Sequence, residues 1–397
     1  MATQQDVAHG SRYNAYMALF MATVAMIVCF MSWSNFAPLS AQVATMFHLS
    51  VGQKTLLLAT PVLLGSIMRI PVGILSDKYG GKKVYIILMV FILIPLFMIT
   101  KVHTFGMLLV AALLVGMAGT SFAVGVSYAS VWFPPEQQGF ALGIVAMGNM
   151  GNAVAALTLP KISASYGFTA VYHFLMVLTV ILIILFAIFC KEMPTNKEKT
   201  ISGALSVAKE SSTWYLSLFY FLTFGLFVSF TNLTPVFLGD IFGVNAVTAG
   251  LYSALFAALC TLIRPVGGSA ADHLRPMSML QWVFILIAIF SAVIMLSFKS
   301  QAIFIIGIVG TGLAAGWGNG VIFKMVPYVS KGNTGAVTGF VGAVGGLGGF
   351  FPPLVVGWIK GWTGSYEIGI ALLIITALIC WYVLRRRFIK GDVHIVQ

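Results

Sequence analysis

Two arginines lie deep inside long apolar stretches of the chain, where a charged side chain is expensive. Arg69 and Arg264 each stand eight residues before an aspartate, Asp77 and Asp272, near the end of the stretch. At about 1.5 Å of rise per helical residue, this spacing puts each guanidinium group about 12 Å into a membrane. An arginine at that depth costs about 2.5–3.5 kcal/mol on insertion scales and normally has a partner. The chemistry of these positions therefore depends on what neutralises them.

No carboxylate of the chain is placed to do so. All ten Asp and Glu residues stand in predicted loops, tails or ends of apolar stretches. Two interpretations remain open: backbone carbonyls and water satisfy each arginine, or the missing partner is a mobile anion, which the recurrence at two matching positions favours. The planar paired donors of guanidinium fit a flat oxyanion such as nitrate or nitrite, whereas tetrahedral phosphate usually needs more donors.

The elements that hold these arginines are predicted to be membrane helices. Of 397 residues, 59% are hydrophobic and 8% are charged, whereas a soluble domain carries about a quarter charged residues. Helix satisfies the backbone in lipid, and the apolar runs are too long for barrel strands. The sequence thus predicts an all-α integral membrane protein with twelve transmembrane helices. The predicted spans, numbered in chain order, are 13–45, 51–76, 83–101, 104–132, 138–165, 167–190, 214–239, 244–271, 277–298, 301–329, 332–359 and 364–384.

A polar stretch divides the twelve spans into two sets of six. Residues 191–211 are interpreted as a cytoplasmic linker between an N-terminal half, 1–190, and a C-terminal half, 212–397. With the N-terminus inside, 14 Lys and Arg lie on the inner side and 5 on the outer side. Because cytoplasmic loops carry such an excess, both termini are predicted to be cytoplasmic, in the cytoplasmic membrane. The net charge of +12 reflects this clustering, so the expected partner is the lipid bilayer and not nucleic acid.

The two halves repeat each other in parallel. Arg69-Ile-Pro-Val-Gly73 matches Arg264-Pro-Val-Gly267 with the arginines 195 residues apart, and Gly148-Asn-Met-Gly-Asn152 matches Gly345-Gly-Leu-Gly-Gly349 at an offset of 197. A parallel repeat of six spans about an axis along the membrane normal is how major facilitator carriers are built.

The second pair of matching segments is rich in glycine. Gly148, Gly151, Gly345 and Gly348 are typical of close helix packing in lipid. Packing without side chains would also let spans 5 and 11 slide past their neighbours. Asn149 lies inside the first glycine run, where a buried amide needs a partner, and it either contacts the anion or holds helices together.

Other chemistry finds little support in the residues. The four cysteines have no metal or redox spacing, and the six histidines lie near span ends or in loops. We therefore expect no metal and no cofactor. An enzyme would also need nucleophiles, metal ligands or acid–base pairs at depth, which are missing from the spans, so the chain is not expected to be an enzyme.

A resemblance to a known superfamily appears between spans 2 and 3. The segment Gly73-Ile-Leu-Ser-Asp-Lys-Tyr-Gly-Gly-Lys-Lys83 resembles the motif that members of the major facilitator superfamily carry there. The resemblance implies that Gly73 permits close helix approach, and that Asp77 and Lys78, with Asp272 in the second half, form a charged motif on the inner face. The motif says nothing about cargo.

Most of the chain is similar, in order, to the nitrate/nitrite porter family of that superfamily. The similarity includes the arginines of spans 2 and 8, Val131-Trp-Phe-Pro134 followed by Gln138-Gly-Phe-Ala-Leu-Gly143, and Thr223-Phe-Gly-Leu-Phe-Val228. It implies that the residues that bind the anion are Arg69, Arg264, Asn149, Phe122, Tyr220 and Phe224.

Lys324 departs from the family pattern, because many members have an uncharged Gln at this place in span 10. A lysine in the inner third of a span is expected to extend its amine toward the membrane surface. Alternatively, it makes a third contact with the anion or acts as a proton-linked switch, since buried lysines shift their pKa readily.

Together these features predict a secondary active transporter that carries nitrate and nitrite by alternating access, as a monomer. Two facing cations without a fixed counter-ion favour exchange of one anion for another. The alternatives are a proton-coupled nitrate symporter, to which Lys324 would contribute, a facilitator for other small anions, including organic ones, and an anion channel. The parallel repeat and the motif between spans 2 and 3 favour a carrier over a channel.

Overall fold

The structure is a computed structural model that describes residues 12–133, 141, 143–192, 206–329 and 334–389. Within these residues the regular structure is helical, with no strand. Ten helical segments are long and apolar enough to cross a membrane, and counting the bent pair of α4 and α5 as one span makes eleven. Predicted span 5, 138–165, includes residues 138–140 and 142, which lie outside the described residues. The all-α membrane fold is therefore confirmed.

The helices of the first part of the chain match the predicted spans, several of which are divided into shorter pieces. They are α2 (Arg12–Trp33), α3 (Ser40–Met46), α4 (Val51–Ile67), α5 (Arg69–Tyr79), α6 (Gly81–Ile99), α7 (Phe105–Val115), η1 (Gly116–Thr120), α8 (Ser121–Ser130), η2 (Met147–Asn149), α10 (Met150–Tyr166) and α11 (Phe168–Phe189).

The second part of the chain has longer unbroken helices. They are η3 (Val207–Lys209), α13 (Ser211–Phe242), α14 (Ala246–His273), α15 (Pro276–Leu296), α16 (Gln301–Val329), α17 (Thr334–Leu347), α18 (Phe351–Thr363), α19 (Glu367–Leu384) and η4 (Arg385–Ile389). The helices α13 and α18 are followed by Gly243 and Gly364, whose φ angles are 67° and 73°. This left-handed conformation is unfavourable for residues with a Cβ, so glycine is common at helix ends of this kind.

Span 2 is bent where the sequence predicts one continuous helix. Its parts, Val51–Ile67 and Arg69–Ser76, meet at an angle of 41°. Pro71 lies four residues after Ile67, and its ring removes the backbone donor and crowds the carbonyl one turn earlier. The bend makes Arg69 the first residue of α5.

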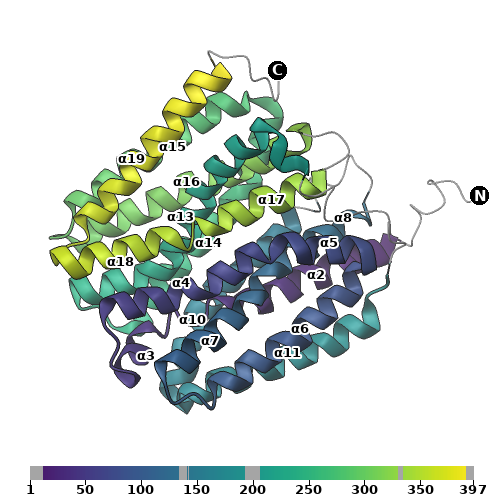
Figure 1. The fold of residues 1–397 in the computed structure, drawn as a ribbon, viewed down its shortest axis with the longest axis horizontal. Helices are drawn as coiled ribbons and strands as arrows, with labels where there is room; N and C mark the ends of the chain where they lie inside the picture. The colour runs from purple at the N-terminus through teal and green to yellow at the C-terminus, as the bar shows by residue number, and fades with distance from the viewer. Residues whose placement is uncertain (1–11, 134–140, 142, 193–205, 330–333, 390–397) are drawn as a thin grey trace, which may run out of the picture.

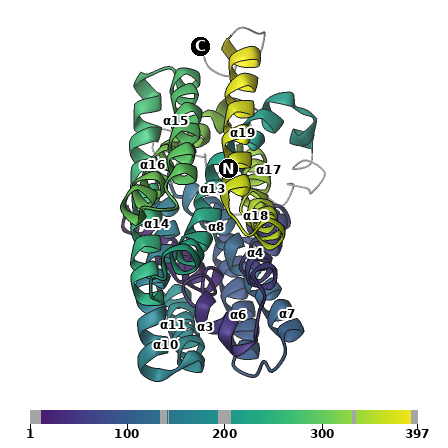
Figure 2. The same cartoon turned by 90° about the vertical axis from the view of Figure 1, so that its left-hand side faces the viewer.

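The two parts of the chain form separate groups of helices that pack side by side. Figures 1 and 2 show α2–α11 gathered in one group and α13–α19 in the other. Contact between the groups is made mainly by α10 with α14, by α4 with α17 and α18, and by α5 with α17. The bounds of the two halves, 1–190 and 212–397, stay a prediction, and most of linker 191–211 lies outside the described residues.

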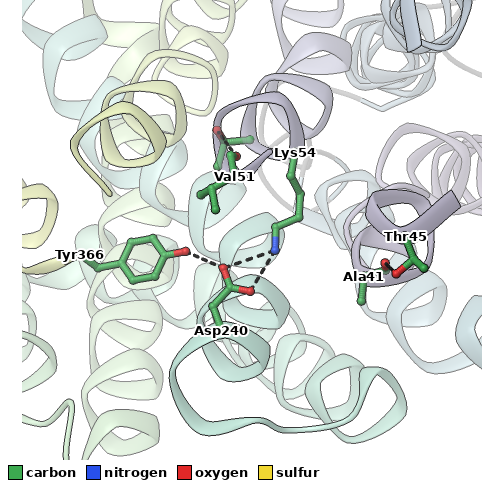
Figure 3. A network of polar contacts seen from close by, with 7 residues as sticks. Ala41, Thr45, Val51, Lys54, Asp240 and Tyr366 are labelled. Carbon is green, nitrogen blue, oxygen red and sulfur yellow. Dashed lines mark hydrogen bonds and ion pairs between the residues drawn. The ribbon is translucent and has the colours of Figure 1, made fainter. Parts of the chain in front are cut away.

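An ion pair joins the two groups at the end of the bundle where α4 begins (Figure 3). Nζ of Lys54, on α4, lies 3.0 Å from the Asp240 carboxylate, on α13. The Tyr366 hydroxyl donates to the same carboxylate over 2.8 Å. Burial, and the neighbouring charge of Asp240, raise the pKa of Tyr366 above its usual value, which keeps the phenol a donor. We refer to these three residues as the end cluster.

Candidate anion-binding site

Arg69 is almost fully buried between the two groups of helices. Its side chain is 1% exposed. Nε donates to the carbonyl of Gly119 over 3.3 Å, and Nη1 donates to the carbonyl of Gly342 over 2.8 Å. Gly119 belongs to η1 in the same half, whereas Gly342 belongs to α17 in the other half. Nη2 has no hydrogen-bond partner among the described residues.

Arg264 lies on the unbroken helix α14 and is 6% exposed. Its Nη2 donates to the hydroxyl of Tyr220 over 3.2 Å. Its Nη1 lacks a hydrogen-bond partner within the described part of the chain. Each arginine therefore retains a buried N–H group whose satisfaction requires something besides the described side chains and backbone.

Aromatic rings connect the two guanidinium groups. The Phe224 ring centroid lies 5.1 Å from Cζ of Arg69 and 5.9 Å from Cζ of Arg264. The rings of Phe122 and Trp33 lie 5.5 Å and 6.0 Å from Cζ of Arg69. Contacts of this length are attractive between a cation and a ring face, so the aromatic walls help to hold both charges in place.

Three further ring contacts complete the wall. Tyr220 stacks on Phe224 with centroids 4.9 Å apart and an interplanar angle of 10°. Phe323 of α16 packs edge-on against Tyr220 at 4.9 Å and against Phe122 at 5.8 Å. The structure thus brings together five of the six residues expected to bind the anion: Arg69, Arg264, Phe122, Tyr220 and Phe224.

The glycine run of α17 passes between the two sides of this site. A Cβ at Gly345 would collide with the ring of Tyr220, and one at Gly346 would collide with Ser66 and approach Nη1 of Arg69 to 3.3 Å. Gly348 follows the last residue of α17, and a Cβ there would strike the backbone of α13. These glycines therefore allow α17 to lie against both halves. Whether they also permit sliding stays a prediction.

The glycine run of span 5 packs differently. A Cβ at Gly148 would overlap Met26, and one at Gly151 would meet the backbone of α2. Asn149, next to Gly148, is fully buried and its Nδ2 donates to the carbonyl of Ala146 over 2.8 Å. Its Oδ1 has no partner among the described residues, and no hydrogen bond links it to either arginine there. The bond to Ala146 lies within one helical segment and joins no second helix, so both interpretations of Asn149, ligand contact and holding helices together, stay predictions.

The remaining predicted residues lie away from the two arginines or outside what the structure describes. Lys78 is exposed beside the Tyr79 ring, at 5.7 Å. A Cβ at Gly73 would lie 3.6 Å from Ala123, an ordinary contact, so the local packing tolerates a methyl group there. The side chains of Asp77 and Asp272 lie outside the described residues. Lys324 is partly buried on α16, next to Phe323.

The site is a buried, aromatic-walled place with two positive charges. Among the described side chains the only ion pair is that of Lys54 with Asp240, so neither arginine is paired with a carboxylate. The same part of the chain shows no group of three or more His, Cys, Asp or Glu that could hold a metal. What this arrangement can do is attract and orient a small anion between guanidinium forks.

Comparison with known proteins establishes the class first. The sequence model of the Major Facilitator Superfamily matches residues 22–351. The fold resembles that of a bacterial homolog to the human lysosomal transporter Spinster, with a TM-score of 0.78 and 16% identity over 96% of this chain and 99% of that one. The human organic anion transporter TETRAN has a TM-score of 0.72 and 14% identity, over 93% and 99% of the two chains. The chain belongs to the major facilitator superfamily and is a multi-pass membrane transporter, which confirms the expectation that it is not an enzyme.

Curated relatives narrow the class. The chain is 36% identical over 364 residues, 91% of its length, to the "Probable nitrate transporter NarT" of Staphylococcus haemolyticus (strain JCSC1435), of which it covers 94%. It is 33% identical, over 91% of its length, to the "Nitrite extrusion protein" of Bacillus subtilis (strain 168), of which it covers 92%. Within the superfamily it therefore belongs to the nitrate/nitrite porter family.

Proposed function

We propose that this protein exchanges nitrate for nitrite across the cytoplasmic membrane by alternating access. The observation that carries the proposal is the pair of buried guanidinium groups. Each has one nitrogen without a hydrogen-bond partner among the described residues, and neither is paired with a described carboxylate. A flat oxyanion between Arg69 and Arg264 would use those donors and neutralise the charge. The printed names of the relatives, a nitrate transporter and a nitrite extrusion protein, point to the same anions.

The exchange step follows from the energy of the empty site. Two like charges at close range in a poorly screened place repel by several kcal/mol. A bound anion replaces that repulsion by two attractions. The halves 1–190 and 212–397 therefore switch between their inward-open and outward-open arrangements readily when the anion is bound and slowly when the site is empty. This difference couples the outward movement of one anion to the inward movement of another.

The proposed orientation has both termini in the cytoplasm, and the excess of Lys and Arg on that side supports it. The end cluster then lies on the outer side, where it ties α4 of one half to α13 of the other. Proton-coupled symport is the second candidate, and one observation favours it. Lys324 is partly buried on α16 and directly follows Phe323, whose ring touches Tyr220, so its backbone lies one residue from the aromatic wall.

A reconstitution experiment tests the proposal. The purified protein in proteoliposomes takes up labelled nitrate from outside, with the vesicles preloaded with nitrite, with nitrate or with neither. Exchange predicts fast uptake into preloaded vesicles and slow uptake into empty ones, independent of a pH gradient. Uptake that requires an inward proton gradient, and does not require preloading, would establish symport instead. Saturation and acceleration by internal anion separate a carrier from a channel, and competition by small carboxylates tests a broader cargo.

A further inference from the structure

Asn319, on α16, is a buried amide without a partner. Its side chain is 0% exposed. Neither Nδ2 nor Oδ1 has a hydrogen-bond partner among the described residues. Polar groups in protein interiors are paired as a rule, so an amide in this state calls for an explanation. Its place in the fold shows what it is able to bind.

The two glycines that flank Asn319 pack against the helices of the arginine site. A Cβ at Gly318 would meet α15 and would approach Thr223, on α13, to 3.0 Å. A Cβ at Gly320 would collide with the carbonyl oxygen of Arg264, on α14. Consecutive side chains on a helix point about 100° apart, so the side chain of Asn319 points between these two directions.

Phe323 identifies this face of α16 as the one that meets the anion site. Residues four apart lie about 40° apart round a helix, so Asn319 and Phe323 share a face. The Phe323 ring packs at 4.9 Å against Tyr220 and at 5.8 Å against Phe122. Tyr220 in turn accepts the hydrogen bond of Arg264. Asn319 therefore lies one helical turn from the aromatic wall, on the face that packs against it.

Free buried donors are concentrated in this region. Four buried side-chain nitrogens have no hydrogen-bond partner within the described part of the chain. Three of them are Nη2 of Arg69, Nη1 of Arg264 and Nδ2 of Asn319, whereas the fourth, Nε1 of Trp132, lies beyond the end of α8. Because Oδ1 of Asn319 is unpartnered as well, the amide is able to turn its N–H groups toward an anion without breaking a hydrogen bond to a described residue.

We propose that Asn319 is a third donor to the anion: its amide N–H binds the third oxygen of nitrate and so sets a preference for nitrate over nitrite. The inference rests on the proposed function, because it places the anion between Arg69 and Arg264. Nitrate is a planar ion with three oxygens, whereas nitrite has two. The free nitrogens of the two arginines serve two oxygens of either anion. The third oxygen of nitrate then pairs with the amide, which bound nitrite leaves unpaired.

Titration calorimetry on the purified protein in detergent tests this role by comparing the Kd for nitrate with the Kd for nitrite. Asn319→Leu has a similar side-chain volume but no donor. It should raise the nitrate Kd about tenfold, equivalent to about 1.4 kcal/mol, and the nitrite Kd by no more than about twofold. Asn319→Ala also lacks the donor and adds no bulk, so it should show the same split even if the leucine variant does not fold.

Ser291→Ala is the matched control. Ser291, on α15, is a second buried polar side chain whose hydroxyl has no partner among the described residues. Its replacement should leave both Kd values unchanged.

Two results overturn the role of Asn319 in a wild-type protein that binds both anions. An unchanged nitrate Kd in Asn319→Ala would show that the amide does not contact the anion. A nitrite Kd that rises by as large a factor as the nitrate Kd would show that the side chain only supports the shape of the site. A wild-type protein that binds neither anion overturns the proposed function and this inference together, so the two failures are distinguishable.

Discussion

Arg69 and Arg264 hold matching places in the two repeats, yet their surroundings differ. Arg69 donates hydrogen bonds to the carbonyls of Gly119, in its own half, and Gly342, in the opposite half. Arg264 donates to Tyr220 of its own half and is the more exposed of the two. The backbone explains the difference, because span 2 bends just before Arg69, and Gly119 lies in the 3-10 segment of span 4, Gly116–Thr120.

The difference suggests a division of labour within a symmetric repeat. Arg69 donates one hydrogen bond to Gly342 on α17 of the other half, so its position depends on how the halves are arranged. Arg264 is tied only within its half and keeps its place when the halves move. We therefore propose that Arg264 mainly anchors the anion, whereas the position of Arg69 couples anion binding to the interface between the halves.

Replacing either arginine with lysine should produce the largest effect. Lysine keeps the charge but loses the planar fork. We expect Arg69→Lys and Arg264→Lys each to cut nitrate exchange about 100-fold, equivalent to about 2.7 kcal/mol. The comparison predicts that Arg264→Lys acts mostly on nitrate Kd, and Arg69→Lys on Kd and turnover together. Arg275→Lys, in the loop before α15, is the matched control. Near wild-type exchange by either site variant would rule out the paired-guanidinium site.

Removing the Tyr220 hydroxyl should have an intermediate effect confined to the Arg264 side. Tyr220→Phe keeps the ring stacked on Phe224 but frees the Arg264 nitrogen that it holds. Nitrate Kd, measured by calorimetry, should rise about fivefold, in line with the loss of one hydrogen bond to a charged group. Tyr172→Phe loses a hydroxyl bond to Asn35 elsewhere in the N-terminal half and should leave Kd unchanged. Equal Kd values for the two variants would contradict the assignment of Tyr220.

Breaking the end cluster should have a smaller effect, on conformation and not on binding. The side chains of Lys54 and Asp240 are 11% and 27% exposed, so their pairing is worth about 0–1 kcal/mol. Asp240→Asn should therefore raise the opening of this end about threefold. A cysteine placed by Thr55→Cys reports it, because Thr55 is buried against Gly357 of the other half. Its labelling by a water-soluble thiol reagent should accelerate, and the charge swap Lys54→Asp/Asp240→Lys should restore the slow rate. Unchanged labelling in Asp240→Asn would show that the cluster does not hold the halves.

Lys324→Gln should have the smallest effect of all. If the lysine only extends toward the membrane surface, exchange rate and pH dependence remain within about twofold of wild type. A variant that loses stimulation by an inward pH gradient but keeps exchange would instead assign proton coupling to Lys324. The measurement is nitrate uptake by both proteins over a series of imposed pH gradients.

The helices could be predicted from the sequence because lipid allows few alternatives. Long apolar runs located the spans, and the repeat around Arg69 and Arg264 indicated the two-part architecture. The breaks within spans were missed. The bend at Met68 depends on Pro71 acting one turn back, and the 3-10 segments at Gly116–Thr120 and Met147–Asn149 depend on tertiary packing that apolar periodicity does not encode.

The sequence could predict which types of side chain form the site, but not its backbone contacts. The charged and aromatic residues were recognisable by type and resemblance, and the structure places most of them together. The carbonyls of Gly119 and Gly342 were not recognisable, because every residue has a carbonyl. Trp33 and Phe323 looked like ordinary span residues. The neighbour of Phe323, the unusual Lys324, was the one indication that this turn of span 10 lies near the site.

The central claim is that the bound anion supplies the negative counter-charge that the two arginines lack. It is tested most directly by efflux. Vesicles loaded with labelled nitrate are diluted into anion-poor buffer, with or without external nitrite and without a pH gradient. A gap of about 5.5 kcal/mol is enough to move an equilibrium from 99:1 to 1:99, so repulsion in the empty site is able to hold the return step back. The account predicts slow efflux alone, fast efflux with nitrite, and little acceleration by chloride, since a sphere does not fit two planar forks. Equally fast efflux with no external anion would contradict it, because the empty carrier would then return unhindered.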